Sequence, residues 1–143
     1  MITDVNLRVS SDQALTTTAV SEDTADLGIA RDMGEGHRLF MNFAVITALT
    51  GGTSVKFEVI SSAAAALTSP TVIGSSDAIV SASLIAGYNT AVAFNPQIAS
   101  LGQRYIGARY TISGTYSAGT VTADVVMDIQ DGKKYYASGF SVT

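Results

Sequence analysis

The chemistry open to this sequence is limited by how few reactive side chains it has. His37 is the only histidine and cysteine is absent, so a serine triad would have one possible base and thiolate chemistry has no residue to use. The Gly-x-Ser-x-Gly elbow of serine hydrolases is missing, and residues 114–119 (GTYSAG) have the wrong spacing. His37 lies in a polar stretch ahead of an apolar one, which favours an exposed turn histidine that titrates, if anywhere, at a subunit contact. We therefore expect no catalytic site.

Metal and cofactor sites also lack their usual patterns. Asp32 with Glu35, and Asp128 with Asp131, are close carboxylate pairs, but neither belongs to the Asp-x-Asp-x-Asp-Gly loop that binds calcium. The glycines of residues 28–36 are not followed by Gly-Lys-Ser/Thr, as a phosphate loop requires. Solvated turn carboxylates are the expected interpretation, with no metal and no cofactor.

Composition indicates a binding surface of unusually low charge. Of 143 residues, 47% are hydrophobic and only 14% are charged, against about 25% charged residues in an average domain. Small neutral residues fill residues 16–18, 61–66 and 113–122. Such side chains cost little to desolvate when another protein covers them, so the composition suits a permanent protein contact.

Charge and segment patterns exclude two classes of partner. The net charge is -4 and the basic residues are scattered, whereas nucleic-acid and membrane-surface binding need clustered Lys and Arg. We find no secretory signal and no run of about 18 apolar residues. The absence of cysteine fits synthesis in a reducing cytoplasm. We expect no nucleic-acid partner, no membrane partner and a soluble protein.

Strand patterns recur along the whole chain. Residues 39–47 (LFMNFAVIT) and 54–62 (SVKFEVISS) are rich in β-branched and aromatic residues, and the turn residues 50–53 between them predict a hairpin. The first run is apolar on both faces, so we expect it to be covered by the core and by something else. Residues 106–112 and 121–129 predict a second pair, joined by the loop 114–119.

Shorter runs complete the predicted fold. They cover residues 12–19, 71–74, 79–85 and 91–94, with turn residues such as 74–77 between them. The helix signal is weak, because residues 61–67 (SSAAAAL) suffice for one turn. Eight or so strands with long connections favour an all-β sandwich of the jelly-roll or Greek-key kind, formed as one domain over residues 1–143.

Several short motifs, in their order and spacing, resemble a family of tailed-phage capsid cement, or decoration, proteins. The resemblance covers nearly the whole chain and is carried by residues 12–16 (DQALT), 26–36 (DLGIARDMGEG), 57–59 (FEV), 69–71 (SPT), 104–106 (RYI) and 119–123 (GTVTA).

The resemblance implies a jelly-roll or related sandwich that assembles as a homotrimer on the outside of an icosahedral head in the virion. There it would bridge neighbouring copies of the major capsid protein. By analogy, the candidate subunit or capsid contacts are the Arg31-Asp32 turn, the Arg104-Tyr105 strand start, and the turn residues Glu35 and His37. The alternative for the two dipeptides is a local ion pair and a tyrosine packed on the core.

Two other classes of function compete with this one. A carbohydrate-binding or adhesin module would stack sugar rings on exposed tyrosines such as Tyr135 and Tyr136, although the chain has no tryptophan. A hydrolase would need His37 or a carboxylate pair in a pocket.

Overall fold

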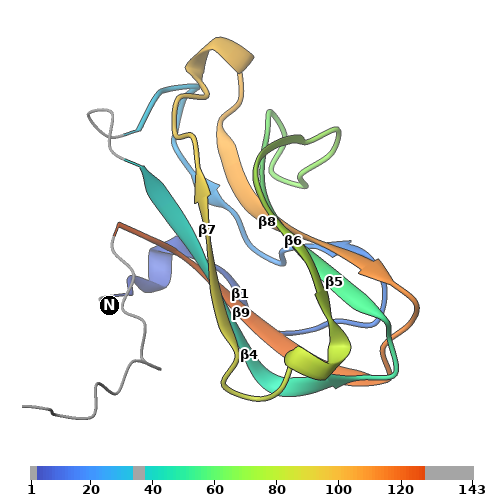
Figure 1. Cartoon of the computed structure of the whole chain (residues 1–143). Coiled ribbons are helices and arrows are strands. Elements are labelled where there is room, and N and C mark those ends of the chain that lie inside the picture. The colour runs from blue at the N-terminus through green and yellow to red at the C-terminus, as the bar shows by residue number, and fades with distance from the viewer. Residues whose placement is uncertain (1–2, 34–37, 128–143) are drawn as a thin grey trace, which may run out of the picture.

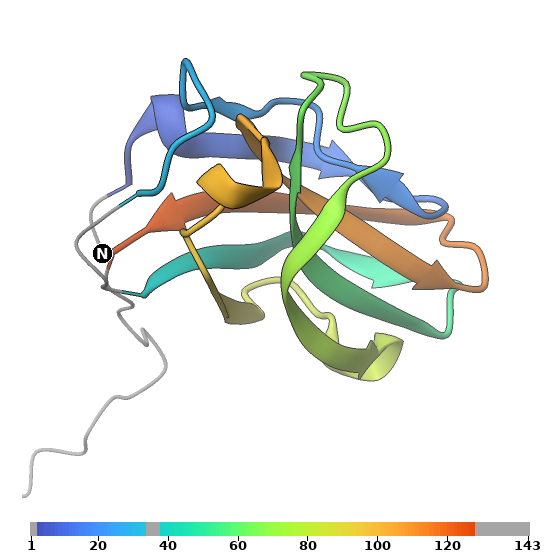
Figure 2. The same cartoon turned by 90° about the horizontal axis from the view of Figure 1, so that it is seen from above.

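The computed structural model describes residues 3–33 and 38–127, which form nine strands in two antiparallel sheets that face one another (Figures 1 and 2). Sheet A has the order β1-β9-β4-β7, and sheet B has the order β2-β8-β5-β6, with β3 also pairing with β8. The strands are β1 (Arg8–Ala14), β2 (Ala19–Val20), β3 (Ala25–Asp26), β4 (Leu39–Thr50), β5 (Ser54–Ser62), β6 (Thr71–Val80), β7 (Asn89–Phe94), β8 (Tyr105–Ser113) and β9 (Ala118–Val126). Three 3-10 turns accompany them: η1 (Val5–Leu7), η2 (Ser81–Ser83) and η3 (Ala99–Leu101).

This strand order is that of a jelly roll in which one strand is broken into β2 and β3. The two pieces pair with successive parts of β8, through Ala19 with Tyr110 and Ala25 with Ile106. The chain crosses between the sheets at most connections, and β5 and β6 are consecutive strands that pair directly. Two stacked four-stranded layers of this kind define the jelly roll. The predicted all-β sandwich is therefore confirmed.

The two predicted strand pairs are wrong in their pairing, although their strands are present. β4 lies in sheet A and β5 in sheet B, and β8 and β9 are divided in the same way. The connections 51–53 and 114–117 are thus arches from one sheet to the other. They lie side by side, because the Thr53 amide donates to the Ser113 carbonyl at 2.9 Å and the Ser117 amide donates to the Thr50 carbonyl at 2.9 Å.

A predicted turn also proves to be part of a strand. Residues 74–77 lie inside β6, which is continuous from Thr71 to Val80. The register with β5 slips between Lys56 and Glu58, where the Ser76 hydroxyl accepts the Phe57 amide at 3.0 Å. The serine side chain replaces a ladder bond, so the turn-forming composition produces a bulge and not a reversal.

The core between the sheets is centred on three aromatic rings. Phe43 and Phe57 have ring centroids 4.9 Å apart, and the edge of Tyr110 meets both at 6.0 Å. The buried Tyr110 hydroxyl donates to Ser10 at 2.7 Å, and Ser10 donates to Gln13 at 2.7 Å. Burial raises the pKa of Tyr110 well above its ordinary value. The core is thus apolar with one satisfied polar chain leading out of it.

Candidate protein-docking surface

Two loops that are far apart in sequence are joined at one end of the sandwich, drawn at the top of Figure 1. They are residues 26–33 and 95–104. The Leu27 amide donates to the Arg104 carbonyl and the Met33 amide to the Pro96 carbonyl, each at 3.1 Å. The Asp32 carboxylate accepts the Ala99 amide at the start of η3, at 2.9 Å. Backbone and side-chain bonds therefore hold both loops in one arrangement.

Asp26 begins this arrangement by serving two partners. One carboxylate oxygen accepts the Gly28 amide at 2.8 Å, and Gly28 has a φ of +79°, which glycine adopts without strain. Both oxygens bind the Arg104 guanidinium, at 2.5 and 2.6 Å. This pairing, followed by the Gly28 bond, lowers the pKa of Asp26 to about 2. An exposed ion pair adds little stability, so its main effect is to fix where Arg104 points.

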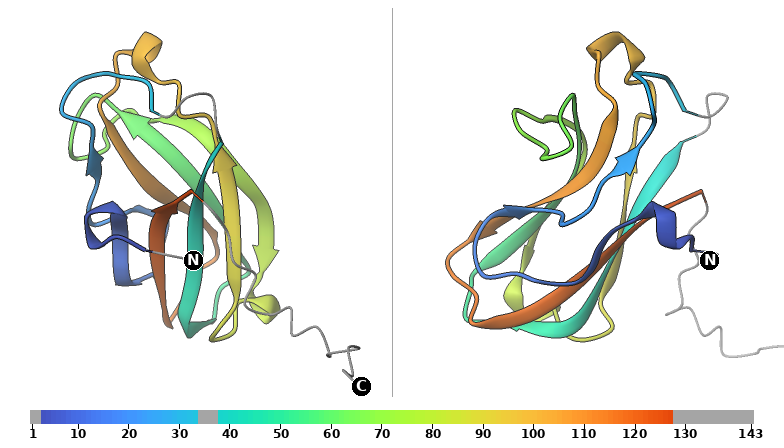
Figure 3. Two further views of the ribbon diagram at one scale, coloured as in Figure 1. Left: turned by 90° about the vertical axis from the view of Figure 1, so that its left-hand side faces the viewer. Right: turned by 180° about the vertical axis from the view of Figure 1, so that it is seen from behind.

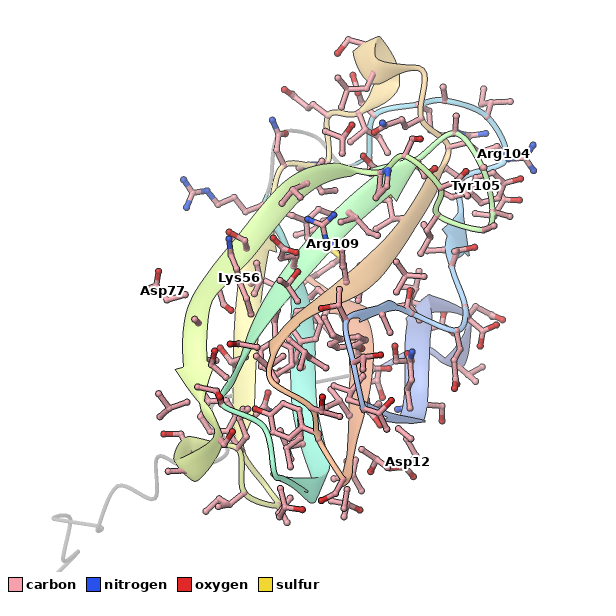
Figure 4. All side chains as sticks on the ribbon, turned by 90° about the vertical axis from the view of Figure 1, so that its right-hand side faces the viewer. Asp12, Lys56, Asp77, Arg104, Tyr105 and Arg109 are labelled. Carbon is pink, nitrogen blue, oxygen red and sulfur yellow. The ribbon has the colours of Figure 1, made fainter. Side chains whose placement is uncertain are left out.

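Arg104 also stacks on an aromatic ring. Its guanidinium carbon lies 5.1 Å from the centroid of the Tyr105 ring, within cation–π range. Tyr105 faces outward, because the next residue, Ile106, is fully buried in the core. Figure 4 shows Arg104 and Tyr105 beside each other near this end. The alternative of a tyrosine packed on the core is not what the structure has.

Arg31 and Asp32 do not form the local ion pair that was the alternative to a contact role. Among the described residues, Asp32 is bound by the Ala99 amide and appears in no salt bridge. Arg31 is exposed, and one of its terminal nitrogens would lie 3.6 Å from a Cβ at Gly28. Its side chain therefore lies over the turn that Asp26 closes.

Two exposed apolar side chains belong to the same end. Ile29 is 62% exposed and Leu101 is 49% exposed. We call the set the apical surface, defined by Ile29, Arg31, Asp32, Leu101, Arg104 and Tyr105. Sequence reasoning missed Ile29 and Leu101. Each is a branched apolar residue beside a glycine in a connection, and that signal could have identified them.

A third loop, residues 63–70, lies at this end and covers part of sheet B. Leu67 is 3% exposed, and a Cβ at Gly107 would collide with its Cδ1 atom. The loop is clasped by Ser62, which accepts the Ala64 amide at 3.1 Å and donates to the Thr68 carbonyl at 2.7 Å. Leu67 has a φ of +53°, a costly conformation for leucine. Its packing on Gly107 offsets that strain.

Two of the predicted contacts cannot be placed in the structure. Glu35 and His37 lie outside the described residues, so their predicted role stays a prediction. Over residues 3–33 and 38–127, no three His, Asp or Glu side chains gather as a metal site would require. The same residues contain no helix long and apolar enough to cross a membrane.

One buried carboxylate on sheet B is used structurally. Glu58, on the outer face of sheet B, is 5% exposed and accepts Arg109 and Thr111, each at 2.7 Å, with Lys56 at 3.5 Å. Desolvation raises its pKa, but the Arg109 bond and the other partners outweigh it, and the net pKa is lowered. Figure 4 shows Lys56 and Arg109 side by side over this strand pair.

Comparison with known proteins identifies the family of the chain. No curated protein matches the sequence. A family model described as Bbp16 matches residues 9–125, which is well over half of the chain and spans the sandwich from β1 to β9. The chain therefore belongs to the Bbp16 family.

Proposed function

We propose that this protein is a structural component of a phage virion that docks on the outside of the icosahedral capsid and stabilises it. It acts as a homotrimer that bridges neighbouring major capsid subunits, and it catalyses no reaction. The observation that carries the proposal is the apical surface. The resemblance to cement proteins suggested four contact residues that lie together there, beside exposed Ile29 and Leu101. They are Arg31, Asp32, Arg104 and Tyr105.

The chemistry of the apical surface supports recognition of another protein. Arg and Tyr are enriched at interface centres, where their apolar parts are buried and their polar ends are paired. Here Arg104 is already oriented by Asp26 and Tyr105 before any partner arrives. Binding then costs little side-chain ordering. The charge of Arg104 is balanced by Asp26, and that of Arg31 by Asp32. The surface therefore suits a protein partner that has charges of both signs more than a polyanion.

The carbohydrate-binding alternative has weaker support. Tyr110 is fully buried and Tyr116 is 1% exposed, so neither can stack on a sugar ring. Tyr105 lies under Arg104. Tyr135 and Tyr136, on which that alternative was first based, lie outside the described residues.

The test uses capsids prepared without this protein. Purified protein is added, the capsids are sedimented, and bound protein is measured against concentration. We expect saturable binding for the native chain and about tenfold weaker binding for Leu101→Glu, because a buried charge at an interface centre costs at least about 1.4 kcal/mol.

The matched control is Val80→Glu, since Val80 is exposed to a similar extent, 57% against 49% for Leu101, but lies at the end of β6 opposite the apical surface. Its binding should equal that of the native chain. Failure of the native chain to sediment with capsids contradicts the proposed function. Equal binding by both glutamate variants contradicts the role of the apical surface.

A further inference from the structure

Arg104 is fixed in place through both its backbone and its side chain. β3 lies against the start of β8, as Figure 3 (right) shows, and their register places Asp26 opposite Tyr105. The Arg104 amide donates to the Ser62 carbonyl, and the Arg104 carbonyl accepts the Leu27 amide, each at 3.1 Å. The guanidinium then binds both oxygens of Asp26 and lies over the Tyr105 ring. Few ways remain for this side chain to move.

The other two arginine–carboxylate pairs of the described residues are held less firmly. Arg8 donates to Asp124 at 2.8 Å, and Arg109 donates to Glu58 at 2.7 Å, each through Nε alone. Neither arginine lies over an aromatic ring of the described ranges. A guanidinium bound through one nitrogen can turn about that bond, whereas two parallel bonds set the plane of Arg104. The geometry therefore distinguishes Arg104 as an oriented group.

The part of the Arg104 guanidinium that Asp26 leaves unbound is an edge of hydrogen-bond donors. An arginine has five N–H groups, and the two bonds to Asp26 use Nε and one N–H of Nη2. The remaining N–H groups are on Nη1 and Nη2, and no residue in ranges 3–33 and 38–127 accepts them. The side chain is 40% exposed, and Figure 4 shows it at the outer margin of the molecule. A partner can therefore reach these donors directly.

The charge around Arg104 favours a neutral acceptor. Arg104 and Asp26 have opposite charges, so the pair is neutral as a whole. A carboxylate on the partner would be attracted by Arg104 but repelled by the adjacent Asp26, and the chain has a net charge of -4. A backbone carbonyl meets no such repulsion, and its bond to a charged donor is stronger than one between neutral groups. The outer face of sheet B differs, because Lys56 and Arg109 there share one carboxylate.

We propose that the free edge of Arg104 donates to a backbone carbonyl of the protein on which this chain docks, and that Asp26 positions Arg104 for that bond. The inference rests on the proposed function and adds the chemical group that the apical surface recognises. Asp26 acts only through Arg104, so removing its charge should weaken docking even though it makes the surface more positive.

The sign of the effect of Asp26→Asn tests the chemistry of the partner, with binding to capsids measured by sedimentation. Asparagine keeps the shape of the side chain and removes its charge. We expect binding to weaken about threefold, because Arg104 loses its alignment, and Asp26→Glu should restore part of the loss. If the acceptor were a carboxylate, the uncovered positive charge would tighten binding. Tighter or unchanged binding by Asp26→Asn overturns the inference.

Arg104→Lys tests whether oriented donors are needed, because lysine keeps the charge but has no planar set of N–H groups. We expect about tenfold weaker binding to capsids. The matched control is Arg109→Lys, because Arg109 is also paired with a carboxylate and is 30% exposed but lies on the outer face of sheet B. This control should bind as the native chain does. Native binding by Arg104→Lys overturns the inference, since a point charge would then suffice.

A measurement on the free chain tests the positioning without capsids. In nitrogen-15 relaxation, the Arg104 Nε–H group should be as ordered as the backbone amides of β8, and Asp26→Asn should make it mobile. A mobile Nε–H group in the native chain overturns the inference. A native chain that ignores capsids contradicts the proposed function, whereas capsid binding that Leu101→Glu weakens and Arg104→Lys does not contradicts the inference alone.

Discussion

Replacing Gly52 with alanine tests the contact that holds the two inter-sheet arches together. A Cβ at residue 52 would lie 2.5 Å from Tyr116 Cζ and 2.7 Å from Cδ2. The Tyr116 ring is 1% exposed, and its hydroxyl lies 2.7 Å from Ser81 Oγ. The Ser81 hydroxyl donates to the Gly52 carbonyl at 2.6 Å. The Tyr116 hydroxyl is therefore the donor in its bond to Ser81. The ring therefore cannot slide away without losing a hydrogen bond.

The cost follows from two opposing effects. Forcing an extra carbon into a packed site costs about 1–3 kcal/mol. The Gly→Ala change also stabilises the folded state by about 0.4–1 kcal/mol, because it restricts the unfolded chain. We expect Gly52→Ala to lower the free energy of unfolding by about 1–2 kcal/mol, which corresponds to a fall in Tm of about 3–6 °C for a chain of this size.

The assay is urea unfolding followed by circular dichroism at one fixed protein concentration, because the stability of an oligomer depends on concentration. The same change is then made in Tyr116→Ala, which itself costs about 3–5 kcal/mol. Without the ring, Gly52→Ala should be neutral or slightly stabilising. An equal loss from Gly52→Ala in both backgrounds would refute the steric explanation.

Two further changes test the apical loops. Asp26→Asn should destabilise the protein at neutral pH, because the folded pKa of Asp26, about 2, lies below the ordinary value of 3.8. The difference should begin to fall below about pH 4 and be lost as pH falls through about 2, where the folded carboxylate is protonated. Unfolding midpoints measured from neutral pH to below about 2 check it, and a difference that is undiminished at about pH 2 contradicts the ion pair with Arg104. Leu67→Ala should lower the free energy of unfolding by about 2–3 kcal/mol, because packing on Gly107 is lost. Leu67→Gly should be no less stable than the alanine variant, because glycine relieves the positive φ. If urea unfolding shows the glycine variant to be clearly less stable, that result argues against strain at this residue.

The positions of strands could be predicted from the sequence, but their partners could not. Alternation such as Val55, Phe57 and Val59 identifies a strand and its buried face from local spacing alone. The choice between a hairpin and an arch at Gly51 and Gly52 depends on a distant residue, Tyr116, that packs on the glycine. Turn composition is the same in both cases, so only the three-dimensional packing decides.

The candidate site could be predicted from the sequence to a similar extent. The sequence motifs identified Arg31, Asp32, Arg104 and Tyr105, which the fold brings to one end. Nothing local to Asp26 indicated its bond to Arg104, because the two lie 78 positions apart. The double apolar pattern predicted for residues 39–47 remains visible in Ile46, exposed on the outer face of sheet A.

The most direct test of the proposed function is the heat resistance of capsids that lack this protein, measured before and after purified protein is added. We predict that shells carrying it release their DNA at a higher temperature than bare shells, and that Leu101→Glu removes the gain. Bare and supplemented shells that break at the same temperature, with the protein left in solution, would contradict the proposed function.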